Sequence, residues 1–466
     1  MMALPEKIDL ETWDARHAGL RRAGLTEPWY GGPLGRHAAD GDERLRALRF
    51  DNAPASLRLW NLVLTEEDRL QEHRDQGKRL VGAMKDLGAV PLLAFAAPEL
   101  VCFYPDGAWW TPCIMECTDG LLNVADRLGI DDTFCPVRAM LGAFETQRHF
   151  PIPDLLTCST GTACDDFTAI ARALERLGHP ILWWEIPHRR TPGPGEEFVT
   201  LPTGFTAPRA QLTFVKAGLE RLCAAFGELA GHPITTGGLH RSILTANRVR
   251  ALAEELWRLV ACATPCPLPA LEMLLVDVLP VHFCSDPAET QATLQELVAE
   301  VRRRVAAGAG VLAPDAVGVY WVNPVADLRV MNLVEEYGAR IVGADFMFAH
   351  ARAEVPVDIE PLEAVAQIAL GDPMAGTAQD RARRIGREIA RCRAEGLVVS
   401  RIPGASHCAS EGGVIRDEIA RRFPHLPVTE IEVPPVADAC FPTLRTRIEA
   451  VVEIARERRN HALRRH

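Results

Sequence analysis

The sequence predicts an α/β protein with two domains, each containing a parallel sheet. Three observations support this fold class: a length of 466 residues, two stretches in which short apolar runs alternate with helical patterns, and a long helical stretch between them. A chain of this length exceeds what one hydrophobic core can hold, so two or three domains are expected. Alternation of short strands with helices is typical of βαβ units around a parallel sheet.

The first part of the chain is expected to hold a helical N-terminal region and the first α/β domain. Residues 1–77 contain helical patterns, the clearest being LRLWNLVLTEEDRLQEHRDQ before Gly77. Residues 78–204 form the first predicted α/β domain, with the helical pattern GLLNVADRLG between two of its strands. Its predicted strands are the apolar runs RLVGAM, PELVCFYP, PDLLTC and HPILWWEIP.

The rest of the chain is expected to begin with helices and to end with the second α/β domain. Residues 205–310 have hydrophobic residues at helical spacing nearly throughout, which predicts a helical segment that bridges the domains. Residues 311–466 predict the second α/β domain, with helices in AQDRARRIGREIARCRAEG and LRTRIEAVVEIARERR. Its predicted strands are VGVYWV, ARIVGADFMF, GLVVSRIP and LPVTEIEVP. A ligand crevice is expected at the carboxyl ends of the strands in each domain.

Composition and charge argue against several classes of protein. The net charge of -11 argues against a nucleic-acid partner, which requires a basic surface. The charged start lacks a hydrophobic signal core, and the most apolar run, from Ala89, is too short and interrupted to span a bilayer. We therefore expect a cytoplasmic protein without a membrane partner. Its 13 cysteines are then core residues, metal ligands or reactive thiols, and not a disulfide framework.

One cysteine lies at a predicted strand-to-helix turn. The segment GTACDDFTAI places Cys164 after a buried strand and before a helix with apolar residues at helical spacing. Asp165 and Asp166 are expected to cap the free N–H groups of this helix. The helix dipole would favour the thiolate form of Cys164. The alternative is a small buried residue that packs under a loop.

Two other cysteines are in similar positions. Cys135 is followed by Pro136, a favoured first residue of a helix, and Cys408 follows a strand and a glycine-containing loop and precedes an amphipathic helix. Three thiolates from two domains suit a metal site at the domain interface, and sulfur ligands select zinc, copper(I) or iron–sulfur clusters. The alternative is three unrelated loop cysteines. His407 could be a fourth ligand, although a histidine beside a ligand more often makes outer contacts.

The remaining cysteines fall into two groups. Burial is the expected environment of those within strand or helix patterns, which are Cys102, Cys158, Cys223, Cys262 and Cys392. Position does not decide the role of those in less regular sequence, which are Cys113, Cys117, Cys266, Cys284 and Cys440.

The three cysteine segments resemble those of the 2-hydroxyacyl-CoA dehydratase family, which includes the cluster-bearing subunits of ATP-dependent benzoyl-CoA reductases. The cluster-binding cysteines of that family match Cys135 in CPVRAMLG, Cys164 in ACDD and Cys408 in SHCAS, with spacings of 29 and 244 residues. The segments EYGARIVGADF and AEGLVVSRI are also similar to family segments. Most specific is LRTRIEAVVEI, which resembles the family's Thr-Arg-Ile-Glu-Ala-Phe helix. The resemblance covers residues 78 to about 460.

The resemblance implies two flavodoxin-like domains with an iron–sulfur (4Fe-4S) cluster between them, bound by Cys135, Cys164 and Cys408. It implies a homologous second subunit in a heterodimer and an ATP-hydrolysing iron–sulfur activator that delivers one electron. In the dehydratases of the family, this electron forms a ketyl radical anion on an (R)-2-hydroxyacyl-CoA thioester. Loss of the hydroxyl group then gives an enoyl-CoA. An open iron would bind a substrate oxygen as a Lewis acid. The sequence identifies no catalytic acid or base.

Three alternative functions would use the same thiols. A benzoyl-CoA-reductase-like subunit would reduce an aromatic acyl-CoA. A non-catalytic subunit would carry a cluster for electron transfer or as a scaffold, while its partner holds the substrate. A zinc enzyme would bind its metal through the same three thiolates.

Three further features have an open interpretation. The segment from His188 to Arg190 follows a predicted strand, and it either binds phosphates of coenzyme A or is a solvated group of charges. Arg445 and Arg447 either face the cluster or a partner subunit, or form a structural ion pair with a carboxylate such as Glu449. Asn323-Pro324 stands where many members of the family carry a glycine-containing turn.

Overall fold

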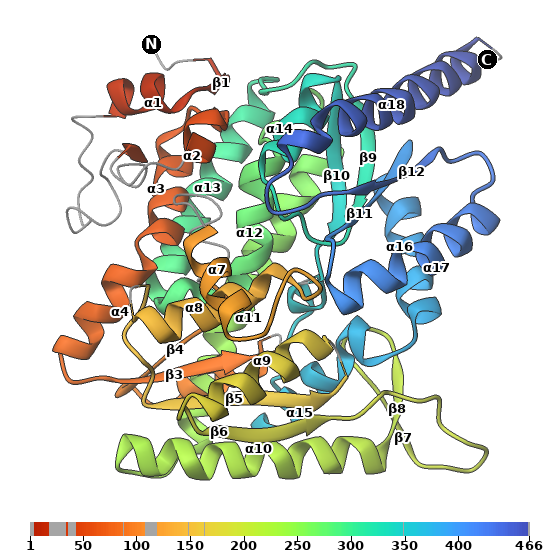
Figure 1. The fold of residues 1–466 in the computed structure, drawn as a ribbon. Coiled ribbons are helices and arrows are strands. Elements are labelled where there is room, and N and C mark those ends of the chain that lie inside the picture. The colour runs from red at the N-terminus through yellow and green to blue at the C-terminus, as the bar shows by residue number, and fades with distance from the viewer. Residues whose placement is uncertain are drawn as a thin grey trace.

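Two parallel four-stranded sheets are the main elements of the fold, with helices before, between and around them (Figure 1). The structure is a computed structural model that describes residues 4–17, 34–35, 43–86, 88–107, 119–147, 149–162, 164–347 and 349–464. The predicted fold class, with two flavodoxin-like parallel-sheet domains, is confirmed. The segment boundaries at residues 77, 204 and 310 stay a prediction. None of the helices in the described ranges has both the length and the apolar character needed to cross a membrane.

The described residues of the N-terminal region are mainly helical, as predicted. Its helices in the described residues are α1 (Leu10–His17), α2 (Glu43–Ala47), α3 (Pro54–Leu64) and α4 (Glu66–Asp75). The pattern predicted as one helix before Gly77 is divided at Thr65, between α3 and α4. A short antiparallel pair, β1 (Lys7–Ile8) with β2 (Phe50–Asp51), was not predicted because two residues are too few to show alternation.

The first sheet has the strand order β4-β3-β5-β6 and is parallel throughout. Its strands coincide with the predicted runs and are β3 (Arg79–Met84), β4 (Leu100–Phe103), β5 (Leu155–Gly161) and β6 (Ile181–Ile186). Side chains alternate between two cores: Val81 and Ala83 lie in the large central cluster, whereas Leu80 and Met84 lie in a second cluster. The helices that follow these strands are α5 (Ala89–Ala94), α7 (Asp119–Arg127), α8 (Ala139–Thr146) and α9 (Asp165–Arg176).

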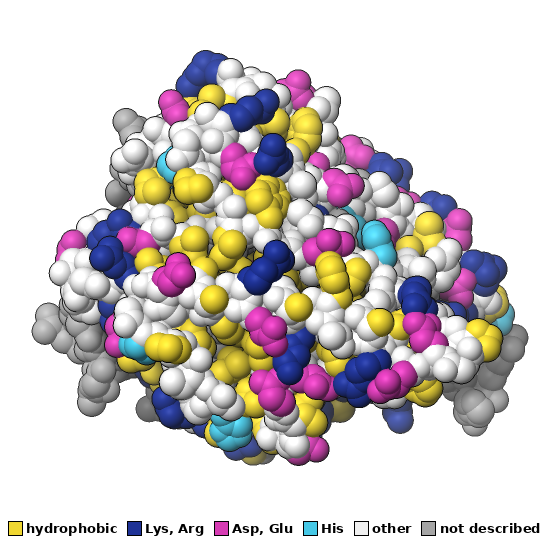
Figure 2. Space-filling model, turned by 90° about the horizontal axis from the view of Figure 1, so that it is seen from below, with side chains coloured by type: hydrophobic (Ala, Val, Ile, Leu, Met, Phe, Trp, Pro, Cys, Tyr) yellow, Lys and Arg dark blue, Asp and Glu magenta, His cyan; other side chains and the backbone are white. Residues whose placement is uncertain are grey.

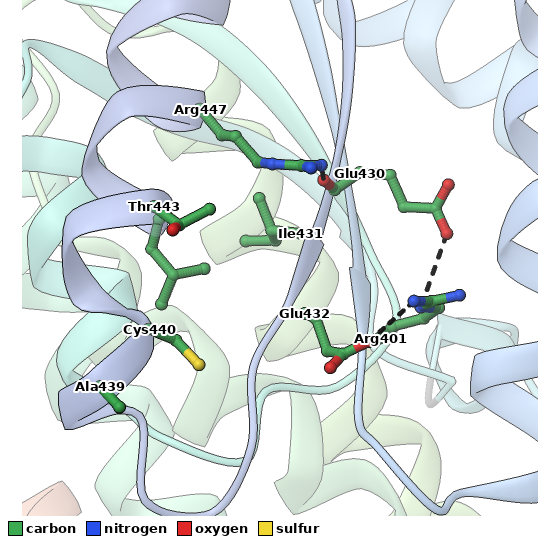
Figure 3. A pocket seen from close by; sticks show the side chains of 9 residues that line it. Arg401, Glu430, Ile431, Glu432, Ala439, Cys440, Thr443 and Arg447 are labelled. Atoms are coloured by element: carbon green, nitrogen blue, oxygen red, sulfur yellow. Dashed lines mark hydrogen bonds and ion pairs between the residues drawn. The ribbon is translucent and has the colours of Figure 1, made fainter.

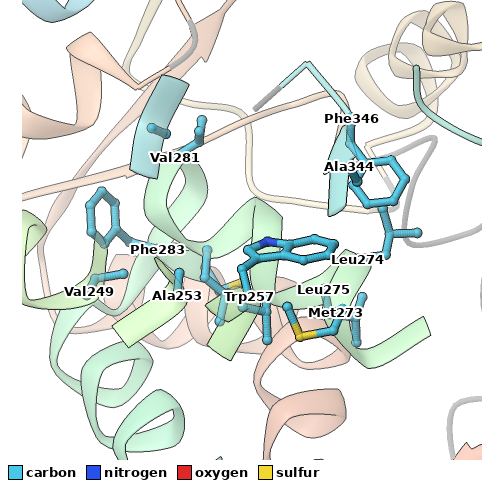
Figure 4. Packing of buried hydrophobic residues seen from close by; sticks show 14 of the residues in the cluster. Val249, Ala253, Trp257, Met273, Leu274, Leu275, Val281, Phe283, Ala344 and Phe346 are labelled. Atoms are coloured by element: carbon cyan, nitrogen blue, oxygen red, sulfur yellow. The ribbon is translucent and has the colours of Figure 1, made fainter. Parts of the chain in front are cut away.

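The segment after the first sheet is helical, as predicted. Its long helices are α10 (Arg209–Ala230), α11 (Thr236–Cys262), α12 (Ala270–His282) and α13 (Pro287–Ala306). A small antiparallel pair, β7 (Phe198–Thr200) with β8 (Thr206–Pro208), lies before α10. Trp257 of α11 packs in the central core among side chains of α12 (Figure 4). On the side that carries α10, hydrophobic side chains lie among charged ones of both signs (Figure 2).

The second sheet has the strand order β10-β9-β11-β12 and is also parallel. Its strands confirm the predicted runs and are β9 (Val317–Val322), β10 (Ala339–Asp345), β11 (Gly396–Arg401) and β12 (Val428–Glu432). Its helices are α14 (Arg329–Glu336), α15 (Pro361–Gly371), α16 (Ala378–Cys392), α17 (Ser406–Arg422) and α18 (Phe441–Leu463). Helices α16 and α17 and part of this sheet share one core cluster, whereas α14 and α18 pack in the central cluster.

Both sheets repeat one local arrangement at the end of the strand that comes first in the chain. The residue after this strand has a left-handed backbone: Lys85 after β3 has φ 61° and Asn323 after β9 has φ 72°. A serine of the third strand bonds to this strand end in both sheets: Ser159 Oγ donates to the carbonyl of Lys85, and Ser400 Oγ donates, at 2.7 Å, to the carbonyl of Pro324, one position further on. Numbered by their order in the chain, the strands of each sheet are arranged second, first, third, fourth, so a ligand is expected at these strand ends.

Candidate metal centre

The three cysteines of the predicted site all lie at the start of a helix. Cys135 directly precedes η2 (Pro136–Arg138), a short 3-10 helix that continues into α8, and Cys164 directly precedes α9. Cys408 is the third residue of α17, so it lies inside the first turn, whereas the sequence predicted a position before the helix. The side chain of Cys408 is outside the part of the structure that is described.

The start of α17 contacts the start of α9 directly. The backbone N–H of Ser406 donates a hydrogen bond of 2.8 Å to Asp166 Oδ2. Ser406 Oγ lies 3.7 Å from Cys164 Sγ, a distance at which a hydroxyl and a thiol form a weak hydrogen bond. Because Cys408 follows Ser406 by two positions in the chain, these contacts bring the beginning of its helix close to Cys164.

The loop before α17 also packs against the loop before Cys135. Gly404 has φ 79°, and a Cβ added to it would lie 2.7 Å from the carbonyl oxygens of both Asp132 and Phe134. Glycine therefore satisfies both the left-handed backbone and the close approach at this position. Since Phe134 is the neighbour of Cys135, one loop of the second domain contacts the approaches to two cysteines of the first.

An apolar cluster lies beside Cys135. Cys135 and Met347 pack against it, and its buried members are Leu121, Ala139, Ala326, Ile402 and Ala405. These residues come from both halves of the chain, so the cluster is part of the interface between them. Apolar surroundings keep water away and strengthen electrostatic interactions at the thiol.

Burial raises the pKa of the Cys164 thiol to about 12, and the Asp166 carboxylate raises this pKa as well. Hydrogen bonds from Ser406 and from the backbone of Phe167 lower it by less. Burial and Asp166 thus oppose the thiolate form that the helix dipole is expected to favour. Coordination to a metal cation would instead favour the thiolate form of Cys164, since a metal-bound thiol loses its proton.

Asp166 has a different role from the helix cap expected from the sequence. Cys164, and neither Asp165 nor Asp166, occupies the N-cap position of α9. Asp165 is exposed in the first turn, whereas Asp166 is 4% exposed. Asp166 Oδ2 lies 3.4 Å from Cys164 Sγ and accepts the bond from Ser406. Asp166 therefore links the two halves of the chain beside the thiol.

Lys85, which the sequence did not single out, lies close to Cys164. Lys85 is 5% exposed, and its Nζ donates a hydrogen bond of 3.0 Å to Thr168 Oγ1 of α9. Burial lowers the pKa of Lys85, while the thiols of Cys158 and Cys164 and the Asp165 carboxylate act in the opposite direction. A positive charge in this position offsets negative charge at Cys164. The one signal in the sequence that could have pointed to Lys85 is its position directly after an apolar strand.

A buried ionic network supports the start of α17. Arg381 of α16 is fully buried and donates to Asn323 Oδ1 at 2.8 Å and to Asp345 Oδ2 at 3.2 Å. Its third partner is Glu411 Oε2 of α17, at 3.0 Å. His407 Nε2 lies 3.4 Å from the same Glu411 oxygen, so the histidine beside Cys408 faces this network. A contact of this kind, outside the set of metal ligands, is the alternative that the sequence analysis considered for His407.

Asn323 has a backbone conformation that glycine adopts most readily. Its φ of 72° is left-handed, and asparagine tolerates this conformation better than most residues. Its Nδ2 donates a hydrogen bond of 2.9 Å to the carbonyl of Ser400, in addition to the bond that it accepts from Arg381. The side chain of Asn323 thus holds this turn to β11 and α16.

Most of the other described cysteines are buried or half-buried. The fully buried ones are Cys102, Cys158, Cys266 and Cys284, and the half-buried ones are Cys223, Cys392 and Cys440. Cys262 is exposed, so the burial expected for it is wrong. It is the last residue of α11, at a helix end that faces solvent. Cys113 and Cys117 are outside the described residues.

The segment from His188 to Arg190 combines two different environments. Arg189 is buried, donates to two backbone carbonyls at the end of α15, and lies 3.9 Å from the centre of the Phe205 ring. Arg190 is exposed and forms an ion pair with Glu196. The interpretation as solvated charges therefore holds for Arg190 and is wrong for Arg189, which joins the end of β6 to α15.

The segment LRTRIEAVVEI lies in α18, whose first turns line a pocket of about 440 Å³ with β12 (Figure 3). Arg447 Nη1 donates a hydrogen bond of 2.6 Å to the backbone carbonyl of Glu430, so its observed partner is β12 and not Glu449. Arg401 on the opposite wall is paired with Glu432 at 2.7 Å. Arg445 is exposed. Of the two arginines of this motif, Arg447 thus contributes to the contact between helix and strand.

The described side chains do not by themselves form a metal site. Among them, no group of three or more His, Cys, Asp or Glu is placed to hold a metal ion. The Cys408 side chain is not among those described, so this result leaves the three-cysteine assignment untested. The ligand set Cys135, Cys164 and Cys408 stays a prediction, which the convergence of their helix starts supports.

Comparison with known proteins gives one family. A family model described as 2-hydroxyglutaryl-CoA dehydratase, D-component, matches residues 88–455. The match includes all three cysteine segments, the whole second sheet and the α18 motif. No curated protein matches the chain.

Proposed function

Because the chain belongs to the 2-hydroxyglutaryl-CoA dehydratase D-component family, we propose that it is an iron–sulfur subunit that dehydrates an (R)-2-hydroxyacyl-CoA to an enoyl-CoA after one-electron activation. One observation carries this proposal. The loop at residues 404–406 of the second domain contacts the approach to Cys135 and the thiol of Cys164, and it leads directly to Cys408.

The proposed ligands of a 4Fe-4S cluster are Cys135, Cys164 and Cys408. Their helix starts present backbone N–H groups, which suit a negatively charged group. The apolar cluster beside Cys135 and the burial of Cys164 also suit a cluster that is kept from water. When bound, the cluster would supply an electron at low potential and, with three protein ligands, an open iron for a substrate oxygen.

Residues around the thiols would prepare this site. Cys164 would release its proton on binding metal, because its pKa is high while no cation is present. Lys85 would offset part of the added negative charge from beside α9. Asp166 would hold the start of α17, and with it Cys408, at a fixed distance from Cys164.

The proposed partners are an acyl-CoA thioester, a homologous second subunit in a heterodimer and an ATP-dependent iron–sulfur activator protein. The description of the family as one component of a dehydratase supports a multi-subunit system. A reaction that consumes ATP and low-potential electrons suits the cytoplasm, and the proposed cluster would make the protein oxygen-sensitive.

The proposal is tested by anaerobic purification, followed by iron and acid-labile sulfide analysis and EPR of the reduced protein. We expect iron and sulfide in equal amounts and the EPR signal of a reduced cluster. Zinc without sulfide would exclude every iron–sulfur function. If a cluster is present, turnover with the activator and partner separates the alternatives: a hydroxyacyl-CoA identifies a dehydratase, an aromatic acyl-CoA a reductase, and turnover of neither a carrier.

A further inference from the structure

Ser406, the first residue of α17, presents its hydroxyl to the thiol of Cys164. Ser406 Oγ lies 3.7 Å from Cys164 Sγ, and either atom can be the donor. The two residues come from different halves of the chain, and Asp166 holds the backbone N–H of Ser406 at 2.8 Å. The hydroxyl is therefore kept in place by a bond in which it takes no part.

The thiols of three other described cysteines face a different kind of group. They donate to backbone carbonyls, Cys158 to Ser159 at 3.4 Å, Cys266 to Leu268 at 3.2 Å and Cys392 to Ile389 at 3.7 Å. A carbonyl oxygen accepts a hydrogen bond but cannot donate one, so these surroundings suit a sulfur that keeps its proton. A hydroxyl can do both. The contact with Ser406 therefore also suits a sulfur that has lost its proton.

Loss of the proton would change which neighbours stabilise Cys164. Its thiol now donates to Asp166 Oδ2, at 3.4 Å. A metal-bound sulfur has no proton to donate, so this contact would become a repulsion between two negatively charged groups. The hydroxyl of Ser406 and the backbone N–H of Phe167 would then remain as donors to the sulfur.

The effect of Ser406 on charge at Cys164 has a definite sign. Burial raises the pKa of the Cys164 thiol to about 12, and Asp166 raises it as well, whereas the hydrogen bonds from Ser406 and Phe167 lower it. A donor that favours negative charge on a sulfur also favours further negative charge on a group that the sulfur binds. In iron–sulfur proteins, hydrogen bonds to the sulfurs are among the features that set the reduction potential.

We propose that Ser406 raises the reduction potential of the cluster, because its hydroxyl donates a hydrogen bond to the Cys164 sulfur and stabilises the reduced state. This inference rests on the proposed function, which supplies the cluster. Reduction adds one electron, delivered by the proposed activator protein, and breaks no covalent bond at Ser406. Because Ser406 acts through Cys164, it is a positioning residue. The second half of the chain would thus help a ligand of the first half to accept negative charge.

A redox titration of the anaerobically purified protein, followed by EPR of the reduced cluster, tests this inference without turnover. Ser406→Ala removes the hydroxyl but keeps the backbone N–H that bonds to Asp166, so the contact between the helix starts remains. At a fixed potential, we expect the ratio of reduced to oxidised cluster to fall about threefold or more, a shift of about 30 mV for one electron. Ser410→Ala is the matched control, because Ser410 lies one turn later in α17, is exposed and bonds to the Ser406 carbonyl. Its potential should equal that of the unchanged protein.

Ser406→Thr and Ser406→Val are a second pair, which also decides the question if Ser406→Ala does not fold. Both side chains are β-branched and of similar shape, but only threonine carries a hydroxyl. The threonine variant should have nearly the potential of the unchanged protein, and the valine variant should have the lowered one. Equal potentials in this pair, or an equal shift in Ser410→Ala, would overturn the role of Ser406 alone. An unchanged protein without iron and sulfide would overturn the cluster proposal and this inference together, so the two failures are distinguishable.

Discussion

The backbone N–H of Ser406 donates a 2.8 Å hydrogen bond to the carboxylate of Asp166, which joins the first turns of two helices from different halves of the chain. The same carboxylate lies beside the thiol of Cys164. One side chain therefore fixes the position of the second-domain helix and also raises the pKa of a proposed ligand.

Asp166→Ala should weaken both stability and metal binding. Removal of the acceptor leaves the Ser406 N–H without its partner, which costs about 1–3 kcal/mol in free energy of unfolding if the group stays buried. Asp166→Asn keeps an oxygen acceptor and should retain most of both properties. Urea unfolding and iron content of anaerobically purified protein measure them. Asp165→Ala, at the exposed neighbouring position, is the control, and an equal loss there would contradict the role of Asp166.

Cys164→Ser should lower the affinity for iron by about tenfold or more, since loss of a ligand costs at least as much as loss of an outer contact. Cys158→Ser is the matched control, because Cys158 lies in β5 of the same segment and is fully buried. It should keep its iron and lose only stability. Iron and sulfide per chain measure the difference, and equal iron loss in both variants would remove Cys164 from the ligand set.

Gly404→Ala should disturb the junction of the two halves. The added Cβ would lie 2.7 Å from two carbonyl oxygens, and the left-handed φ of 79° disfavours alanine, so a loss of about 1–3 kcal/mol is expected. Gly413→Ala is the control in α17, where an added Cβ meets no atom within 4 Å and helix propensity predicts a gain of up to about 1 kcal/mol. Urea unfolding of both variants checks this, and similar effects would show that the contact at Gly404 relaxes freely.

Asp86→Asn should change how stability depends on pH. Burial raises the pKa of Asp86 from 3.8 to about 6 in the folded protein. Between these values the unfolded chain gives up the proton while the folded chain keeps it, so stability contributed by this group falls as pH rises. The neutral amide lacks this penalty, and the variant should gain about 3 kcal/mol relative to the unchanged protein between pH 4 and pH 7. Urea unfolding at the two pH values measures it; parallel pH profiles would contradict the shift.

The sequence was sufficient for features that depend on local pattern. The apolar runs gave the strands of both sheets, because a strand buried on two faces is apolar along its length. Pro136 and the apolar spacing after Cys164 indicated where helices begin. Positions of cysteines relative to helix starts follow from such signals and needed no knowledge of the tertiary structure.

Contacts between distant segments were not accessible in this way. Asp166 carries a typical helix-start signal, but its bond to Ser406 joins residues 240 positions apart. The charged run that contains Arg189 suggested solvent, yet the end of β6 meets α15 and encloses that side chain. Arg250 falls in an ordinary helical pattern, and its burial depends on the loop around Ala353. Such pairings are set by how the elements pack, which periodicity does not encode.

A left-handed residue after the first strand, next to a serine of the third strand, makes each half of the chain look like a copy of the other. In a homodimer every substitution appears twice, whereas two fused copies can change one at a time. Here the equivalent position holds an ammonium in one copy, at Lys85, and an amide in the other, at Asn323. Both side chains are buried, and each is bonded within its own half: Lys85 donates to Thr168 of α9, whereas Asn323 donates to the carbonyl of Ser400 and accepts from Arg381. The same strand end is therefore held to its neighbours by different chemistry in the two sheets.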